Sequence, residues 1–147
     1  MRIAALLLAG LTVFGGELRF SMRSDPKTLE PLAITDQNSA IVRQLTAARL
    51  LRRNRATQKL EPELAEKWEV REKGRLLVFR LRPGLQYADG TPADSQDVRV
   101  TLERLLDPVK AYPMSEGLRT AGITGVETPG PLEVRIRTAQ PDRKSVV

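Results

Sequence analysis

Alternating apolar and polar residues predict a β-hairpin in the middle of the chain. The stretch Arg75 to Arg82 places three apolar side chains on one face, as a half-buried strand does: Leu77, Phe79 and Leu81. The stretch Trp68 to Arg71 is its expected partner, and Glu72-Lys73-Gly74 lies between the two with a glycine available for a positive φ. The pattern therefore predicts two antiparallel strands joined by a short connection.

Shorter patterns predict three more strands and one helical turn. Glu17 to Met22 alternates polar and apolar residues, as a half-buried strand does. Gly122 to Glu127 and Leu132 to Arg137 are expected to be two strands joined through Thr128-Pro129-Gly130-Pro131. Leu64 to Trp68 is expected to form one helical turn that leads into the strand of the hairpin. The chain is thus predicted to combine a sheet with helices.

A first helix is predicted from Asp36 to about Leu51. Apolar residues recur there at helical spacing, at Ile41, Leu45 and Ala48. Its N-terminal end offers three side chains that accept hydrogen bonds from the first backbone amides, and any of them could be the cap: Asp36, Asn38 or Ser39.

A second helix is predicted after the tight turn Asp89-Gly90-Thr91-Pro92. Asp94 is its expected N-cap, and Asp97, three residues later, is expected to reach back in a variant of the capping box. Asp107-Pro108 should end the helix. Its buried stripe is expected to consist of Val98, Leu102 and Leu105.

Residues 1–16 have the pattern of a signal peptide. Met1-Arg2 gives a short positive start, and Ile3 to Phe14 is an apolar stretch too short to span a bilayer, with cleavage expected near Gly16. The alternative is a buried first strand or helix of a cytosolic protein. A bacterial lipid anchor needs a cysteine, and the sequence contains none. The exported protein is therefore expected to be soluble in the periplasm.

The absence of both cysteine and histidine removes much of the catalytic repertoire. No Cys nucleophile, Cys/His zinc site, His base or Ser-His-Asp triad can be built from these 147 residues. Carboxylate pairs such as Glu61 with Glu63 or Asp94 with Asp97 would suit glycoside hydrolysis. Surface charge and helix capping explain these pairs better, so the chain is not expected to be an enzyme.

The formal net charge of +6 and the sequence pI of about 10.2 raise nucleic acid as a partner. The densest basic run, Arg49 to Arg55, holds four arginines and no aromatic residue that could stack on a base. A solvated surface with a basic bias explains the charge better, and nucleic-acid binding is not expected.

Five segments resemble the signature of family 5 extracellular solute-binding proteins. They are Leu64 to Val70, Gly74, Val78 to Arg82, Tyr87 to Pro92, and Asp97-Val98. Further matches occur in the same order at Thr28 to Pro31, Leu105 to Pro108 and Ile123 to Glu127. The family includes the oligopeptide-, dipeptide- and nickel-binding components of ABC importers, and the resemblance covers about residues 17 to 141.

The resemblance implies an α/β protein with the N-terminal part of a type II periplasmic-binding-protein fold: a mixed sheet with a hairpin and flanking helices, incomplete. Family members are usually several times longer, so residues 17–141 are expected to be the N-terminal portion of the solute-binding domain. The expected partners are a peptide or another small solute and ABC permease subunits in the membrane. A monomer without cofactor or metal is expected, and this chain should not bind a peptide tightly by itself.

The resemblance also places one segment at the ligand cleft, because in peptide-binding relatives the residues after the Leu-Asp-Pro-like stretch reach the ligand. Here these residues are Thr35, Asp36 and Gln37, with Thr35 and Gln37 as the first choices for ligand contact. The alternative role of Thr35 and Asp36 is helix capping.

Two segments depart from the family pattern. Ala47 to Leu50 lacks the usual aromatic residue and glycine, and Arg52 to Lys59 is more basic than the expected turn.

The last six residues, Asp142 to Val147, do not continue the family pattern after Gln140-Pro141. The nucleotide sequence GATCGGAAGAGCGTCGTG encodes them and matches a widely used sequencing-library adapter, so residues 142–147 are expected to be a sequencing artefact. The alternative is a natural disordered terminus. If the short form is a genuine product, the alternative function is a small secreted interaction module that uses exposed sheet edges. An independent read of the genomic DNA across these codons decides whether residues 142–147 are an artefact or a genuine part of the protein.

Overall fold

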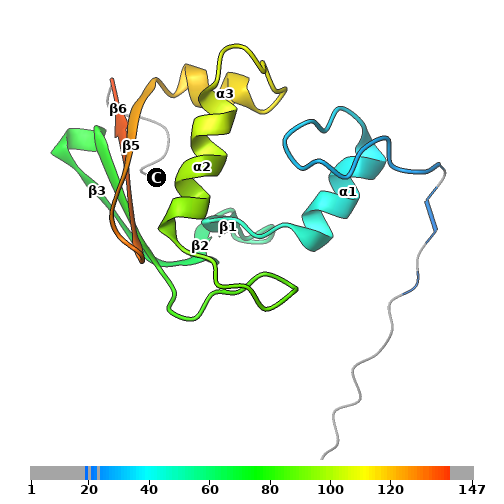
Figure 1. The fold of residues 1–147 in the computed structure, drawn as a ribbon, viewed down its shortest axis with the longest axis horizontal. Helices are drawn as coiled ribbons and strands as arrows, with labels where there is room; N and C mark the ends of the chain where they lie inside the picture. The colour runs from blue at the N-terminus through cyan, green and yellow to red at the C-terminus, as the bar shows by residue number, and fades with distance from the viewer. Residues whose placement is uncertain (1–18, 20, 23, 140–147) are drawn as a thin grey trace, which may run out of the picture.

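A computed structural model describes residues 19, 21, 22 and 24–139, and it has the mixed α/β architecture that the sequence predicts. A sheet, the helix α2 that lies beside it, and the separate helix α1 follow one another across the molecule (Figure 1). The elements in chain order are α1 Gln37–Thr46, β1 Leu51–Arg53, β2 Leu60–Pro62, β3 Ala65–Arg71, the 3-10 turn η1 Glu72–Gly74, β4 Leu76–Leu81, α2 Ser95–Leu106, α3 Ser115–Thr120, β5 Ile123–Gly130 and β6 Glu133–Thr138.

The main sheet has the strand order β3-β4-β6-β5, and all its neighbouring strands are antiparallel. Phe79 of β4 pairs with Trp68 of β3 on one side and with Val134 of β6 on the other. The predicted hairpin is confirmed, and η1 forms its connection, with Gly74 at a φ of 91°. β4 is therefore a central strand, and the rest of the sheet is built outward from it.

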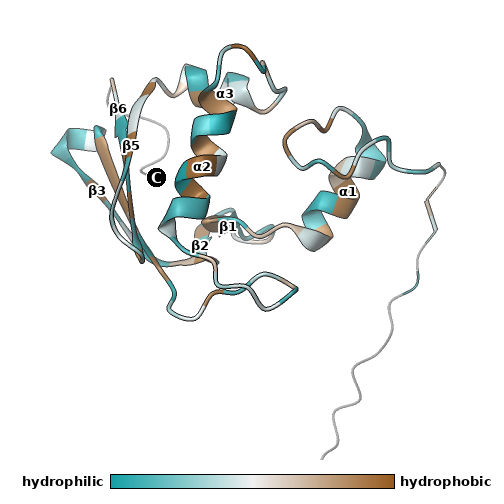
Figure 2. Ribbon diagram, viewed as in Figure 1, coloured by the Kyte–Doolittle hydropathy of each residue, from teal (hydrophilic) through white to brown (hydrophobic). Residues whose placement is uncertain are grey.

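The hydrophobic core lies between this sheet and α2. Its buried members come from three strands of the sheet: Ala65, Phe79, Leu81, Val134 and Ile136. Val98 and Leu102 of α2 pack against this cluster, and Leu105 is buried. Figure 2 shows apolar residues interleaved with polar ones along α2, as the predicted stripe requires. The helix thus covers the sheet with one apolar face.

The predicted N-terminus of α2 is confirmed with its capping box. The Asp94 carboxylate accepts a hydrogen bond from the Gln96 backbone N–H at 2.7 Å, and the Asp94 N–H donates to Asp97 Oδ2 at 2.8 Å. The turn before it is also confirmed. Asp89 Oδ1 accepts hydrogen bonds from the Thr91 hydroxyl and the Thr91 N–H, and these bonds lower the pKa of Asp89 from its ordinary value.

The predicted helical turn at Leu64 to Trp68 is wrong, because β3 begins at Ala65. Ala65 pairs with Leu81, and its N–H donates to Leu50 O at 3.0 Å. The helix-forming residues of this stretch therefore extend against β4, since burial and pairing in a sheet outweigh the small differences in helix propensity.

The first helix is shorter than predicted and ends at Thr46 instead of Leu51. Ala47 is already extended, with φ −100° and ψ 129°, and Leu51 opens a strand that pairs with Pro62. The small β1–β2 hairpin was not predicted. The six-residue α3 was also not predicted, because no side chain caps its N-terminus and it is too short for a periodic pattern.

The last two strands are confirmed, although β5 runs to Gly130 and the turn moves to Pro131-Leu132. Most of the predicted strand Glu17 to Met22 lies outside the described residues, and Arg19, Ser21 and Met22 are not in a strand. The predicted signal peptide, residues 1–16, and the tail, residues 142–147, lie outside the described residues. None of the helices in the described part has the length and apolar character needed to cross a membrane.

Truncating the centre of the core should destabilise the fold far more than truncating the exposed face of α1. Leu81 is 1% exposed and Leu45 is 60% exposed. We expect Leu81→Ala to lower the free energy of unfolding by about 2–5 kcal/mol, and Leu45→Ala by at most about 0.5 kcal/mol. Urea unfolding followed by Trp68 fluorescence measures both changes, and equal losses would contradict this description of the core.

Candidate functional site

The three residues predicted to contact ligand lie at the N-terminal end of α1, where the structure gives them different environments. Thr35 and Gln37 are exposed, whereas Asp36 is half-buried and caps the helix. Asp36 Oδ1 accepts the Ser39 N–H at 3.0 Å, and its Oδ2 accepts the Ser39 hydroxyl at 2.6 Å. The side-chain bond and then the backbone bond from Ser39 lower the pKa of Asp36 from its ordinary value of 3.8.

Two contacts hold the chain before α1 against the start of the helix. The Thr28 N–H donates to the Ser39 hydroxyl at 3.1 Å, and Asn38 Nδ2 donates to Ser24 O at 2.7 Å. Ser39 is buried, so its hydrogen bonds are shielded from water. The backbone that presents Thr35 and Gln37 is therefore fixed from both sides.

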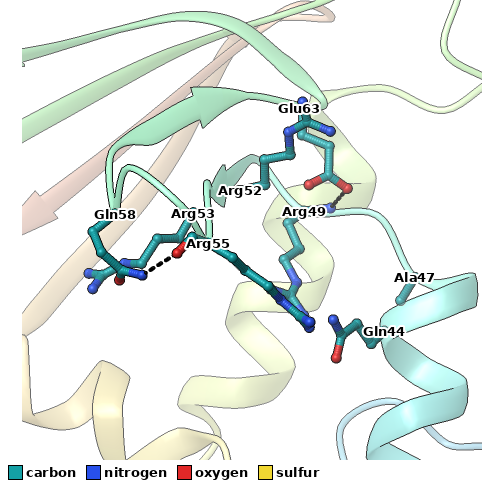
Figure 3. Close-up of a pocket in the computed structure, with 8 residues that line it drawn as sticks. All are labelled: Gln44, Ala47, Arg49, Arg52, Arg53, Arg55, Gln58 and Glu63. Carbon is teal, nitrogen blue, oxygen red and sulfur yellow. Dashed lines mark hydrogen bonds between the residues drawn. The ribbon is translucent and has the colours of Figure 1, made fainter.

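A pocket of about 560 Å³ lies at the opposite end of α1 (Figure 3). The residues that line it come from the end of α1, the following loop and the β1–β2 hairpin: Gln44, Ala47, Arg49, Arg52, Arg53, Arg55, Gln58 and Glu63. Since α1 has ten residues, it is roughly 15 Å long. Thr35, Asp36 and Gln37 are absent from the lining, so the structure does not bring them together with the arginines.

The pocket carries strong positive charge. Four arginines line it against the single carboxylate of Glu63, which accepts the Arg49 backbone N–H at 3.0 Å. Arg52 forms an ion pair with Glu61 at 3.0 Å, and Glu61 also accepts Asn54 Nδ2 at 2.7 Å. The Asn54 bond and, to a lesser extent, Arg52 lower the pKa of Glu61.

From the sequence alone, the basic run Arg49 to Arg55 was interpreted as an incidental surface bias. The signal that pointed to it was the departure of Arg52 to Lys59 from the family pattern. The pocket itself depends on the β1–β2 hairpin, which brings Arg55 toward the end of α1, and that hairpin was not predicted. Within residues 24–139, no cluster of three or more carboxylates suited to a metal ion occurs.

Comparisons with known proteins identify the family. The sequence pattern of the bacterial extracellular solute-binding proteins, family 5 (middle region), matches residues 59–147. The chain is 33% identical, over 71% of its length, to the Escherichia coli protein named "Probable deoxycholate-binding periplasmic protein YgiS". It covers only 19% of that relative.

Solved structures have the same fold. Haemophilus influenzae OppA in complex with RPPGFSPFR superposes with a TM-score of 0.76 and 21% identity, over 84% of this chain and 27% of OppA. AgaA of Agrobacterium tumefaciens R10 in complex with agropinic acid gives a TM-score of 0.74 and 29% identity, over 82% of this chain and 24% of AgaA. The chain thus spans about a fifth to a quarter of the length of these relatives, and it belongs to the bacterial extracellular solute-binding proteins of family 5.

Proposed function

We propose that this chain is part of the extracytoplasmic substrate-binding component of a peptide-type ABC importer, which binds oligopeptides or similar solutes and delivers them for import. The observation that carries the proposal is the match of the fold, over 84% of the chain, to a protein solved with a bound peptide. Solute-binding proteins of this kind hold ligands by burial and hydrogen bonding in a cleft, without covalent chemistry. The chain therefore has no catalytic role in the proposal.

Thr35 and Gln37 are the proposed ligand contacts of this chain. Both side chains are exposed and follow a backbone that Ser39 and Asn38 hold in place. The Gln37 amide can donate to a peptide carbonyl and accept from a peptide N–H, and the Thr35 hydroxyl can do either. Asp36 would contribute its remaining acceptor capacity, since its carboxylate already binds Ser39.

The proposal includes the route and the partners of the protein. Residues 1–16 would direct export and then be cleaved, which agrees with the periplasmic names of relatives such as YgiS. The mature protein would act as a monomer that passes its solute to permease subunits in the membrane. The ligand would be a peptide or another small solute, because the names of the relatives include a bile acid, peptides and glutathione.

Two substitutions on α1 test the proposed contacts. In the product of the complete genomic reading frame, Thr35→Ala and Gln37→Ala should each weaken binding of the best ligand from a peptide panel by about 3- to 10-fold, because each removes one hydrogen bond. Gln44→Ala is the matched control, since Gln44 is an exposed glutamine of the same helix at its other end. Calorimetry measures the affinity of all three variants. The proposal would be contradicted if no peptide bound, or if Gln37→Ala and Gln44→Ala weakened binding equally.

The cap at Asp36 predicts a pH dependence. Its folded pKa is depressed, so the carboxylate stabilises the folded state above its unfolded pKa of 3.8 and this contribution is lost as the pH falls through the lower, folded pKa. We expect the Ser39 amide resonance to titrate with a midpoint below 3.8. Ser39→Ala removes the hydroxyl whose hydrogen bond is the largest cause of the lowered pKa. This variant should therefore raise the midpoint of Asp36, which can be followed at the NMR resonance of the Asp36 carboxyl carbon. A native midpoint at or above 3.8 would show that Asp36 is not held in this way.

A further inference from the structure

In the arginine pocket, defined by the eight residues in Figure 3, the side chains of Arg49 and Arg55 point toward the same part of the pocket. Arg49 comes from the loop after α1, and Arg55 comes from the tip of the β1–β2 hairpin. Figure 3 shows both side chains directed toward Gln44, whereas Arg53 points the other way, beside Gln58. Two positive charges and an amide therefore face one part of the pocket.

The charges of Arg49 and Arg55 are not neutralised within the described part of the chain. Arg52 has Glu61 as its ion-pair partner. Within residues 24–139, neither the Arg49 nor the Arg55 guanidinium has an acidic partner, because Glu63 accepts only the backbone N–H of Arg49. Like charges that converge repel each other, and an anion between them would remove this cost. Guanidinium groups suit oxyanions, since each can donate two parallel hydrogen bonds.

The hairpin that carries Arg55 is held by its own hydrogen bonds. Asn54 Oδ1 accepts the N–H groups of Ala56 and Thr57 at 2.9 and 3.0 Å, and the Gln58 N–H donates to Asn54 O at 2.8 Å. Gln58 Nε2 donates to Arg55 O, also at 2.8 Å. The backbone of Arg55 is therefore fixed before any ligand arrives, which lowers the entropy cost of binding.

The shape of the pocket favours a small solute. Its volume of about 560 Å³ falls within the range of roughly 300–1,000 Å³ typical of small-molecule sites. No aromatic residue lines it, so it offers no surface on which a nucleobase could stack. We propose that Arg49, Arg55 and Gln44 bind a doubly charged oxyanion, of which inorganic phosphate is the simplest. This site is distinct from the proposed peptide contacts, and its test does not depend on whether a peptide binds there.

Calorimetry of the 147-residue chain with inorganic phosphate tests this proposal, with sodium chloride keeping the ionic strength constant. Arg49→Gln and Arg55→Gln should each weaken phosphate binding by about 10-fold or more, because each removes charged hydrogen bonds. Arg53→Gln is the matched control, since it removes the same charge from the same hairpin but from a side chain that points away. We expect its effect to stay within about threefold. Gln44→Ala should also weaken binding, and Gln37→Ala should not.

Two further ligands identify which class of oxyanion the pocket binds. Sulfate tests a second tetrahedral dianion, and succinate tests a dicarboxylate. Preference for phosphate and sulfate supports a tetrahedral group, and equal succinate binding supports the same site with carboxylate ligands. Equal weakening by Arg53→Gln and Arg55→Gln would overturn the proposal in favour of diffuse attraction, as would phosphate heats no larger than those of chloride.

Discussion

The burial of β4 between β3 and β6 is the constraint on which the rest of this structure depends. Leu81 is 1% exposed and Val134 is not exposed at all, and both lie in the layer that α2 covers. The Leu81 N–H donates to Leu132 O, and the Arg82 N–H donates to Leu64 O, so the end of β4 is fixed on both sides. Because a packed interior tolerates few voids, these side chains set the distance between the sheet and α2.

The same core reaches the arginine pocket through a short chain of backbone contacts. Ala65, a buried member of the core, donates its N–H to Leu50 O, and Leu64 donates to Arg49 O. These bonds position the start of β1, and the pairing of Leu51 with Pro62 then places the hairpin beside the end of α1. The two ends of α1 therefore differ in chemistry: a capped, exposed N-terminus and an arginine-rich C-terminus.

Local chemistry made part of this fold predictable from the sequence. The hairpin at Glu72–Gly74 and the capping box of Asp94 and Asp97 both depend on neighbours within a few residues, and both were predicted. The Leu64 to Trp68 stretch was misjudged, because its helix-forming residues are held extended by pairing with a strand that follows them. The arginine pocket could not be predicted, since it needs the end of α1 and the hairpin tip to meet. The order of the family motifs indicated the fold class that local patterns left open.

α1 stands apart from this core. It contributes no residue to the buried cluster, and Leu45 on its surface is largely exposed. Its contacts with the rest of the described chain include the side-chain bonds from Asn38 to Ser24 and from Arg43 Nη1 to Met114 Sδ. A helix held by exposed side-chain contacts of this kind can open locally without unfolding the sheet.

Native-state hydrogen exchange of the backbone amides tests the central claim most directly, because it measures the free energy of opening at each residue. If β4 is the centre on which the fold depends, the amides of Phe79 and Val134 should exchange only through global unfolding. The amides of Ile41 and Val42 in α1 should then exchange much faster, through local opening. Equal protection of α1 and β4, or weaker protection of β4, would contradict the account.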